Sequence, residues 1–236
     1  MESISFVEKL AIVALSLVFA VTLHEIAHGY TVNFFGDSTA KNLGRLTLNS
    51  TSHIDLIGSI IIPTLLFMFS KGTFCFGYAK PVPVIFSKLK RPRLHMICVA
   101  LGGPGANLIQ AIFWSLAFIF AELLYPSTYL LLKAICSYGI LINVILLALN
   151  LFPLPPLDGA RVLSAQLPEK FSKLFSKIEL FGLLVVIFLL LEGIFSDFWI
   201  KPLMGLIFIF FDLFVFPIKM LLNVGENLFF EYSKYA

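Results

Sequence analysis

Long apolar stretches without charged residues alternate with short polar stretches along this chain, and each long stretch predicts a helix. The first predicted helix begins near Leu10 and continues to about Phe35. Further helices are predicted at residues 94–121, 134–157, 180–191 and 202–211. A helix of about 20 apolar residues spans the hydrocarbon core of a bilayer. The pattern predicts an all-α membrane protein, a polytopic helical bundle of about five to six transmembrane or re-entrant segments.

The apolar segment at residues 54–70 is shorter than the others and is interrupted by Pro63. It is followed at residues 71–93 by a basic stretch rich in proline and glycine, which predicts a small membrane-associated loop or hairpin. Basic loops favour the cytoplasmic side, which places both this loop and the basic connector at residues 161–177 inside. Residues 54–70 then either re-enter on one side or cross the membrane, and the sequence leaves both alternatives open.

Composition excludes an ordinary soluble domain. Hydrophobic residues make up 59% of the 236 residues and charged residues only 13%, with a mean hydropathy of +0.95, whereas soluble domains are about 25% charged. Residues 1–236 are predicted to form a single integral-membrane domain, with its core at about 5–163, accessory helices at about 178–217 and an interfacial tail at 218–236. Three scattered cysteines without CxxC spacing predict no disulfide framework.

Candidate chemistry lies in the first helix, at His24-Glu25-Ile26-Ala27-His28. Residues four apart lie on one face of a helix, so two neutral imidazoles can hold a zinc ion while Glu25 reaches a water. Polar groups in hydrocarbon are unfavourable unless they have partners or a function. The alternatives are a chance match and a pair of core histidines with hydrogen-bond partners.

A second polar site follows the apolar stretch that ends near residue 157. A catalytic zinc commonly has three protein ligands and one open position, and Asp158 is the candidate for the third ligand. Prolines break the helix just before it, and Gly159 beside it permits unusual backbone angles. The alternative is an ordinary helix terminus with Asp158 solvated at the membrane interface.

Together these motifs resemble the site-2 protease family of intramembrane zinc metalloproteases. The resemblance rests on HEIAH and on the spacing N-x-x-P-x-x-P-x-D-G, and it extends to Gly103-Pro104-x-x-Asn107. Two further stretches, residues 46–55 and 77–83, resemble the compact bacterial branch that lacks PDZ and CBS domains. The similarity covers about residues 20–163, with Asn49-Ser50 standing where that branch tends to have Asn-Pro. The N-x-x-P-x-x-P-x-D-G residues are Asn150, Pro153, Pro156, Asp158 and Gly159.

The resemblance implies an intramembrane zinc endopeptidase that cuts within or near transmembrane helices, as in regulated intramembrane proteolysis. One zinc per chain would be held by His24, His28 and Asp158, with Glu25 as the catalytic base. The implied partners are transmembrane-helix substrates and the lipid bilayer, with no nucleic acid, and the implied location is the bacterial cytoplasmic (inner) membrane.

Three further residues are candidates for oxyanion stabilisation or substrate binding. The Asn150 amide could donate to the oxyanion or, alternatively, bond the broken helix backbone. Asn107 is either a polar contact toward the site or an interhelical hydrogen bond. His53 either acts near the metal or is solvated at the interface. Residues 77–84 could offer an extended edge to an unwound substrate, or form a structural turn.

A second class of function remains open, namely a membrane protein that binds metal without hydrolysis, such as a zinc transporter or a helix-binding scaffold. Transporters often show inverted repeats and polar residues in several spans. Neither feature is visible in this sequence.

Overall fold

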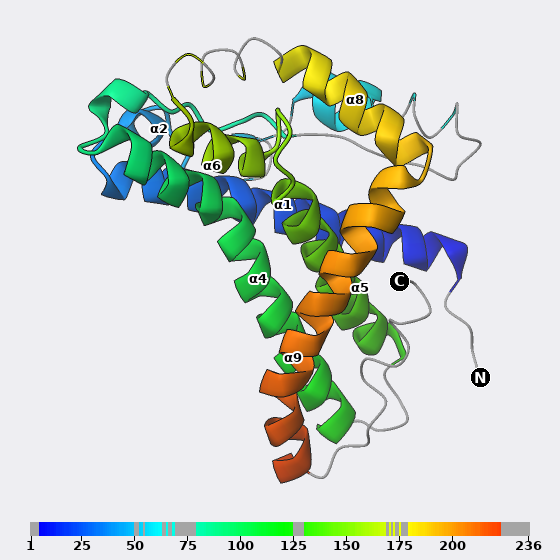
Figure 1. Ribbon diagram of the computed structural model, residues 1–236. Helices are drawn as coiled ribbons and strands as arrows, with labels where there is room; N and C mark the ends of the chain where they lie inside the picture. Colours follow the sequence, from blue (N-terminus) through cyan, green and yellow to red (C-terminus); the bar gives the residue numbers. More distant parts are fainter. Residues whose placement is uncertain are drawn as a thin grey trace. The chain divides into compact units, whose positions relative to one another are not determined.

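The computed structural model describes most of residues 5–222, and every element in that part of the chain is a helix (Figure 1). The residues within this range that it leaves out are 50–51, 54, 63–64, 66–67, 69–78, 125–129, 169, 171, 173–174 and 176–178. The predicted all-α membrane fold is confirmed.

Three helices are long and apolar enough to cross a membrane: α1 (Phe6–Phe34), α4 (Pro92–Leu124) and α5 (Leu130–Asn150). A fourth span is possible if a bent pair counts as one broken span. That pair joins α8 (Glu179–Leu191) to the π-helix η4 (Ser196–Ile200) and α9 (Lys201–Leu222). These four agree with the predicted bundle, and its remaining segment, residues 54–70, is described only in part.

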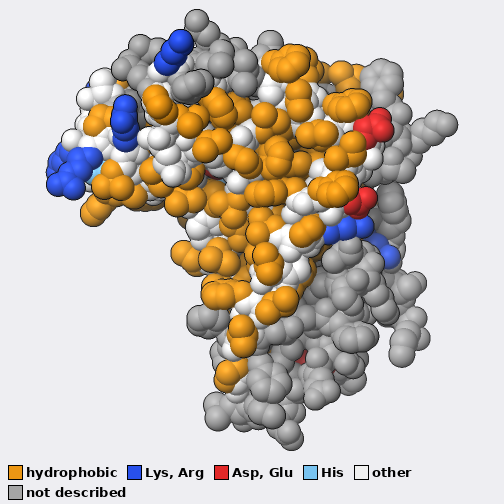
Figure 2. Space-filling model, viewed as in Figure 1, with side chains coloured by type: hydrophobic (Ala, Val, Ile, Leu, Met, Phe, Trp, Pro, Cys, Tyr) orange, Lys and Arg blue, Asp and Glu red, His pale blue; other side chains and the backbone are white. Residues whose placement is uncertain are grey.

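Large apolar side chains are exposed along these helices. Phe113 and Phe120 on α4 are 60% and 55% exposed, and Phe198 in η4 is 81% exposed. Among the described residues visible in Figure 2, most side chains are hydrophobic and few are charged. A surface of this kind suits contact with lipid rather than with water.

The chain separates into two compact units, each built from distant parts of the sequence. The first comprises residues 1–20, 107–149 and 196–236, and the second comprises residues 21–106 and 150–195. Both motifs with candidate chemistry, HEIAH and the segment containing Asp158, belong to the second unit. The prediction of a single domain stays a prediction.

The first unit packs around Trp114 on α4. A Cβ at Gly139 of α5 would lie 2.6 Å from the Trp114 ring, so only glycine permits this close approach. Phe19 of α1 meets the same indole edge-on at 6.4 Å between ring centroids. Near the C-terminal end of α5, the Trp199 indole donates to the Ala148 carbonyl at 2.8 Å.

The helix predicted at residues 134–157 ends earlier than predicted. Helix α5 ends at Asn150 rather than near residue 157, because the prolines that follow cannot continue a helix. A new helix, α6 (Asp158–Gln166), then occupies part of the predicted connector at residues 161–177. Asp158 is therefore the first residue of a helix, not a residue at the end of one, and an acidic side chain there is favoured by the helix dipole.

The segment at residues 54–70 begins as the π-helix η2 (Leu56–Ile61), capped by Asp55, whose carboxylate accepts from the backbone N–H groups of Ile57 and Gly58. Its crossing or re-entry lies outside the described residues, as does the loop at 71–78. A short helix, α2 (Thr39–Asn42), follows α1, and the basic stretch at residues 71–93 contains the 3-10 helix η3 (Phe86–Lys88). Of the predicted tail, residues 223–236 lie outside the described part.

A buried carboxylate joins the end of α1 to the segment before α4. Asp37 is fully buried, and its carboxylate accepts from the backbone N–H of Thr39 at 3.0 Å and from that of Ile85 at 2.6 Å. Burial would raise the pKa of Asp37, but these hydrogen bonds and the nearby Lys88 ammonium outweigh it and lower the pKa. The ionised carboxylate therefore stabilises the fold.

Replacing Asp37 with Asn is expected to lower the unfolding temperature at pH 7 by about 3–8 °C, because an amide is uncharged and has one acceptor oxygen, so one of the two backbone N–H groups loses its acceptor. A folded pKa that is depressed gives stability above the unfolded pKa, and this stability is lost as the pH falls. The difference in unfolding temperature between Asp37→Asn and the wild type should therefore become smaller below about pH 4. Thermal unfolding in detergent across a pH series measures this. The control is Asp197→Asn, whose side chain is 65% exposed.

Candidate metal centre

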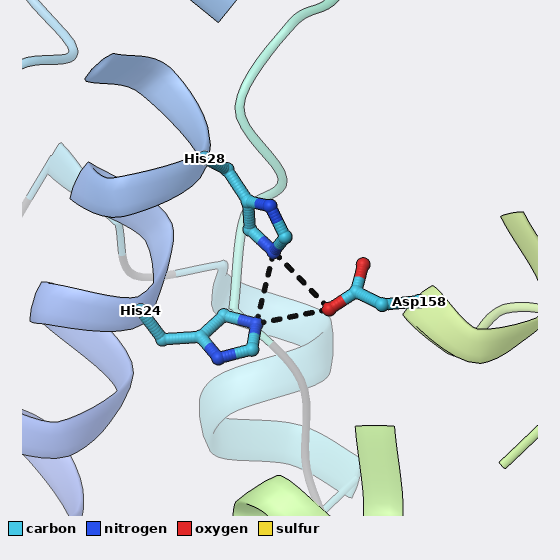
Figure 3. Close-up of side chains that lie close together, drawn as sticks. All are labelled: His24, His28 and Asp158. Atoms are coloured by element: carbon cyan, nitrogen blue, oxygen red, sulfur yellow. Dashed lines mark hydrogen bonds and ion pairs between the residues drawn. The ribbon is translucent and has the colours of Figure 1, made fainter. Parts of the chain in front are cut away.

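Three buried side chains converge on one point in the second unit (Figure 3). The Nε2 atoms of His24 and His28 lie 3.0 Å apart, and Asp158 Oδ2 lies 3.2 and 3.1 Å from them respectively. All three residues are less than 10% exposed. The structure thus brings together two motifs that are 130 residues apart in sequence.

Local structure sets the position of each side chain. The two histidines are one helical turn apart on α1, so their rings project from the same face. Asp158 is placed by the turn before α6, where Leu157 is extended and the helix begins immediately after it. Gly159 is required at this turn, because a Cβ there would overlap the Leu151 carbonyl.

A backbone carbonyl orients His28. Its Nδ1 lies 2.7 Å from the carbonyl oxygen of Val99 on α4, so Nδ1–H donates and the Nε2 lone pair faces His24 and Asp158. Metal-binding imidazoles commonly have such a partner on the second ring nitrogen. The contact fixes both the tautomer and the angle of the ring.

Gly103 on α4 lies against both imidazoles. A Cβ at this position would overlap the Nε2 atoms of His24 and of His28. The helix backbone therefore approaches the site more closely than any other residue type would allow. At Gly105, two residues further along α4, a Cβ would enter open space.

The three donor atoms fit a zinc ion. Tetrahedral bonds of about 2.0–2.1 Å separate ligand atoms by roughly 3.3–3.4 Å, close to the observed 3.0–3.2 Å. Burial would raise the pKa of the Asp158 carboxyl, but the neighbouring imidazoles of His28 and His24 outweigh it and lower the pKa. Two imidazoles and one carboxylate form a common donor set of catalytic zinc sites, and among the described residues this is the one such cluster found.

Glu25 follows His24 on α1 and is half-buried. Its Oε2 accepts a hydrogen bond of 3.2 Å from the backbone N–H of Val82. This contact joins the candidate catalytic carboxylate to the segment that precedes η3.

The other predicted site residues are not part of this cluster. His53 is buried, and its Nε2 lies 3.1 Å from the Thr47 carbonyl. The alternative prediction for His53 is solvation at the membrane interface. A side chain this buried is not solvated. Asn150 is half-buried at the end of α5, and Asn107 is fully buried in the first unit. Oxyanion or substrate binding by these three residues stays a prediction.

Sequence reasoning missed three neighbours of the candidate site: the Val99 carbonyl, the Val82 N–H and the contact of Gly103 with the imidazoles. The first two are backbone groups, which any residue type provides, so no motif marks them. Gly103 stands in a run of small residues that predicts close helix packing, and packing alone does not reveal what the glycine contacts.

Several curated proteins are similar to this chain. "Putative zinc metalloprotease YwhC" of Bacillus subtilis is 35% identical over 182 residues, which cover 74% of this chain and 78% of that protein. "Putative zinc metalloprotease Rip2" of Mycolicibacterium smegmatis is 27% identical over 217 residues, covering 89% and 76%. The protein of the same name in Mycobacterium tuberculosis is 28% identical over 194 residues, covering 82% and 70%. No protein-family model and no solved structure matches the chain.

Removing the Asp158 carboxylate is expected to abolish metal binding. Elemental analysis of purified protein should give about one zinc per chain for the wild type and a small fraction of that for Asp158→Ala, because two imidazoles alone bind zinc weakly. Asp197→Ala, which removes an exposed carboxylate, should retain the wild-type content. Full retention in Asp158→Ala would remove this residue from the ligand set.

A methyl group at position 103 is expected to displace the imidazoles. Gly103→Ala should weaken zinc binding by about 10- to 100-fold, the usual range for changes to groups that orient ligands. Competition with a chelator of known affinity measures the change. Gly105→Ala makes the same substitution where there is room and should bind zinc like the wild type. Equal affinities for the two variants would contradict the close approach of α4.

Proposed function

This chain belongs to the family of the zinc metalloprotease homologue YwhC, and from that premise we propose that it is an intramembrane zinc endopeptidase of the site-2 protease type. It would hydrolyse peptide bonds within or near the transmembrane helices of other membrane proteins. The proposed setting is the bacterial cytoplasmic membrane, and the proposed role is regulated intramembrane proteolysis.

The observation that carries the proposal is the convergence of His24, His28 and Asp158. The two histidines and the adjacent Glu25 lie on α1, which is long and apolar enough to span a bilayer. Buried histidines and carboxylates in apolar surroundings are unfavourable without a partner. A zinc ion would be held by all three side chains together and would supply Lewis-acid chemistry at this point.

The side chains of this site have separate proposed roles. His24, His28 and Asp158 hold zinc, which when bound supplies a Lewis acid that polarises a carbonyl and acidifies water. Glu25 accepts a proton from the attacking water at its carboxylate and donates it to the departing amine. The hydrogen bond between His28 and the Val99 carbonyl keeps the His28 lone pair directed at the metal position.

Substrate recognition is proposed to depend on local unwinding. A peptide carbonyl inside a helix is already hydrogen-bonded and its backbone is surrounded by side chains, so the substrate helix must open before a water can attack. Helix-weakening residues near the cut should therefore favour cleavage. Asn150, Asn107 and His53 are the residues proposed to contact the opened substrate or its oxyanion.

Glu25→Gln is expected to retain zinc and to lose cleavage by about 100-fold or more, because an amide cannot take the proton. The measurement is cleavage of a candidate transmembrane helix in detergent or vesicles, with zinc content measured on the same sample. Glu192→Gln, which changes an exposed glutamate, is the matched control and should remain active.

Two outcomes would contradict this proposal. Loss of zinc in Glu25→Gln would make Glu25 a ligand rather than the base. Zinc flux into sealed vesicles by a wild type that cleaves no helix would favour a transporter, the alternative class of function.

A further inference from the structure

A segment without regular secondary structure, residues 79–85, passes beside the candidate base. Prolines at 81 and 83 favour extended backbone on either side of Val82. Val82 is only 6% exposed, although it lies in a segment without regular secondary structure. Its burial and its flanking prolines give this part of the loop a defined conformation.

The segment is fixed to its surroundings at both ends. At its beginning, the Lys80 N–H donates to the His53 carbonyl at 2.8 Å. At its end, the Ile85 N–H donates to the buried Asp37 carboxylate at 2.6 Å. Between these anchors, the Val82 N–H donates to Glu25.

Arg45 donates hydrogen bonds to several backbone carbonyls in and around this segment. Its guanidinium donates to the carbonyl of Ser52 and, at 3.4 and 3.3 Å, to those of Lys80 and Pro81. A guanidinium has five N–H donors in a rigid planar arrangement, so one side chain can hold several acceptors in fixed relation. The Pro81 carbonyl belongs to the same peptide group as the Val82 N–H, so Arg45 acts directly on the peptide that contacts Glu25.

Gly29 lets this segment approach α1. A Cβ at Gly29 would lie 3.5 Å from a methyl group of Val82 and would overlap the side chain of Leu46, the residue after Arg45. The residue that follows HEIAH is thus covered by the segment and by the chain that carries Arg45. The backbone near Glu25 has little room to move.

We infer that the main-chain N–H of Val82, held in place by Arg45, positions the Glu25 carboxylate for catalysis. The hydrogen bond occupies Oε2, so the other carboxylate oxygen, Oε1, is left to accept the proton. Glutamate has several rotatable bonds, and a fixed donor restricts them to one arrangement. Val82 and Arg45 are therefore positioning residues. This inference rests on the proposed role of Glu25 as the base.

The test compares two substitutions at Val82. Val82→Pro removes the N–H, and the extended backbone that is favoured before Pro83 is compatible with proline. Val82→Ala removes the packing of the side chain but keeps the N–H. We expect Val82→Pro to lower kcat by about 10- to 100-fold with little change in KM or zinc content, and Val82→Ala to lower it less than about 3-fold.

Arg45 is tested in the same assay. Arg45→Met should lower kcat in the same way as Val82→Pro, and Arg45→Lys should restore only part of it, because an ammonium lacks the planar set of donors. Lys41→Met removes an exposed cation on α2 of the same unit and should leave kcat unchanged. Equal kcat values for Val82→Pro and Val82→Ala, or a parallel loss of zinc, would overturn the inference.

A measurement without catalysis separates this inference from the proposed function. Amide hydrogen exchange of a peptide covering residues 80–86 should become faster in Glu25→Ala and in Arg45→Met than in the wild type, but not in Lys41→Met. Unchanged exchange rates in Glu25→Ala and Arg45→Met would contradict the positioning of Glu25 by Val82 and Arg45, even if the wild type cleaves helices. Faster exchange in these variants, together with a wild type that cleaves no helix, would support the positioning contact and contradict the proposed protease function.

Discussion

This structure depends on one constraint, which is the high free-energy cost of burying ionisable groups in apolar surroundings without partners. His24, His28 and Asp158 are nearly inaccessible to solvent, and each finds its partners in the other two. The elements around them are arranged to make this possible. Helix α6 begins at Asp158, the backbone of α4 comes close at Gly103, and the Val99 carbonyl turns His28 toward its partners.

Much of the fold could be predicted from the sequence because uncharged apolar runs mark membrane helices strongly. The cores of α1, α4 and α5 lie within their predicted ranges. The predicted end of α5 is too late, since an apolar run continues through Leu151 and Leu157 while the prolines have already ended the helix. Hydrophobicity reports burial in lipid or protein, whereas helix termination depends on backbone hydrogen bonds.

For the site, the sequence predicts the residue types but not how they are supported. HEIAH and Asp158 are recognisable because their side chains are of the types that bind zinc, and helical spacing places the two histidines together. The support comes from backbone atoms at Val82 and Val99, and from a missing side chain at Gly103. Such contacts depend on tertiary packing. Almost every residue type has the same backbone N–H and C=O groups, so the identity of the residue does not reveal a backbone contact.

The second unit is discontinuous, and its two parts, residues 21–106 and 150–195, meet at the candidate metal centre. An ion shared by His28 and Asp158 would act as a cross-link that closes a loop of 130 residues. Closing a long loop has a substantial entropic cost in the unfolded chain, so a ligand bound only to the closed form stabilises that form. Metal occupancy and the integrity of this unit would then be linked equilibria, and starvation for zinc would affect the protein's lifetime as well as its chemistry.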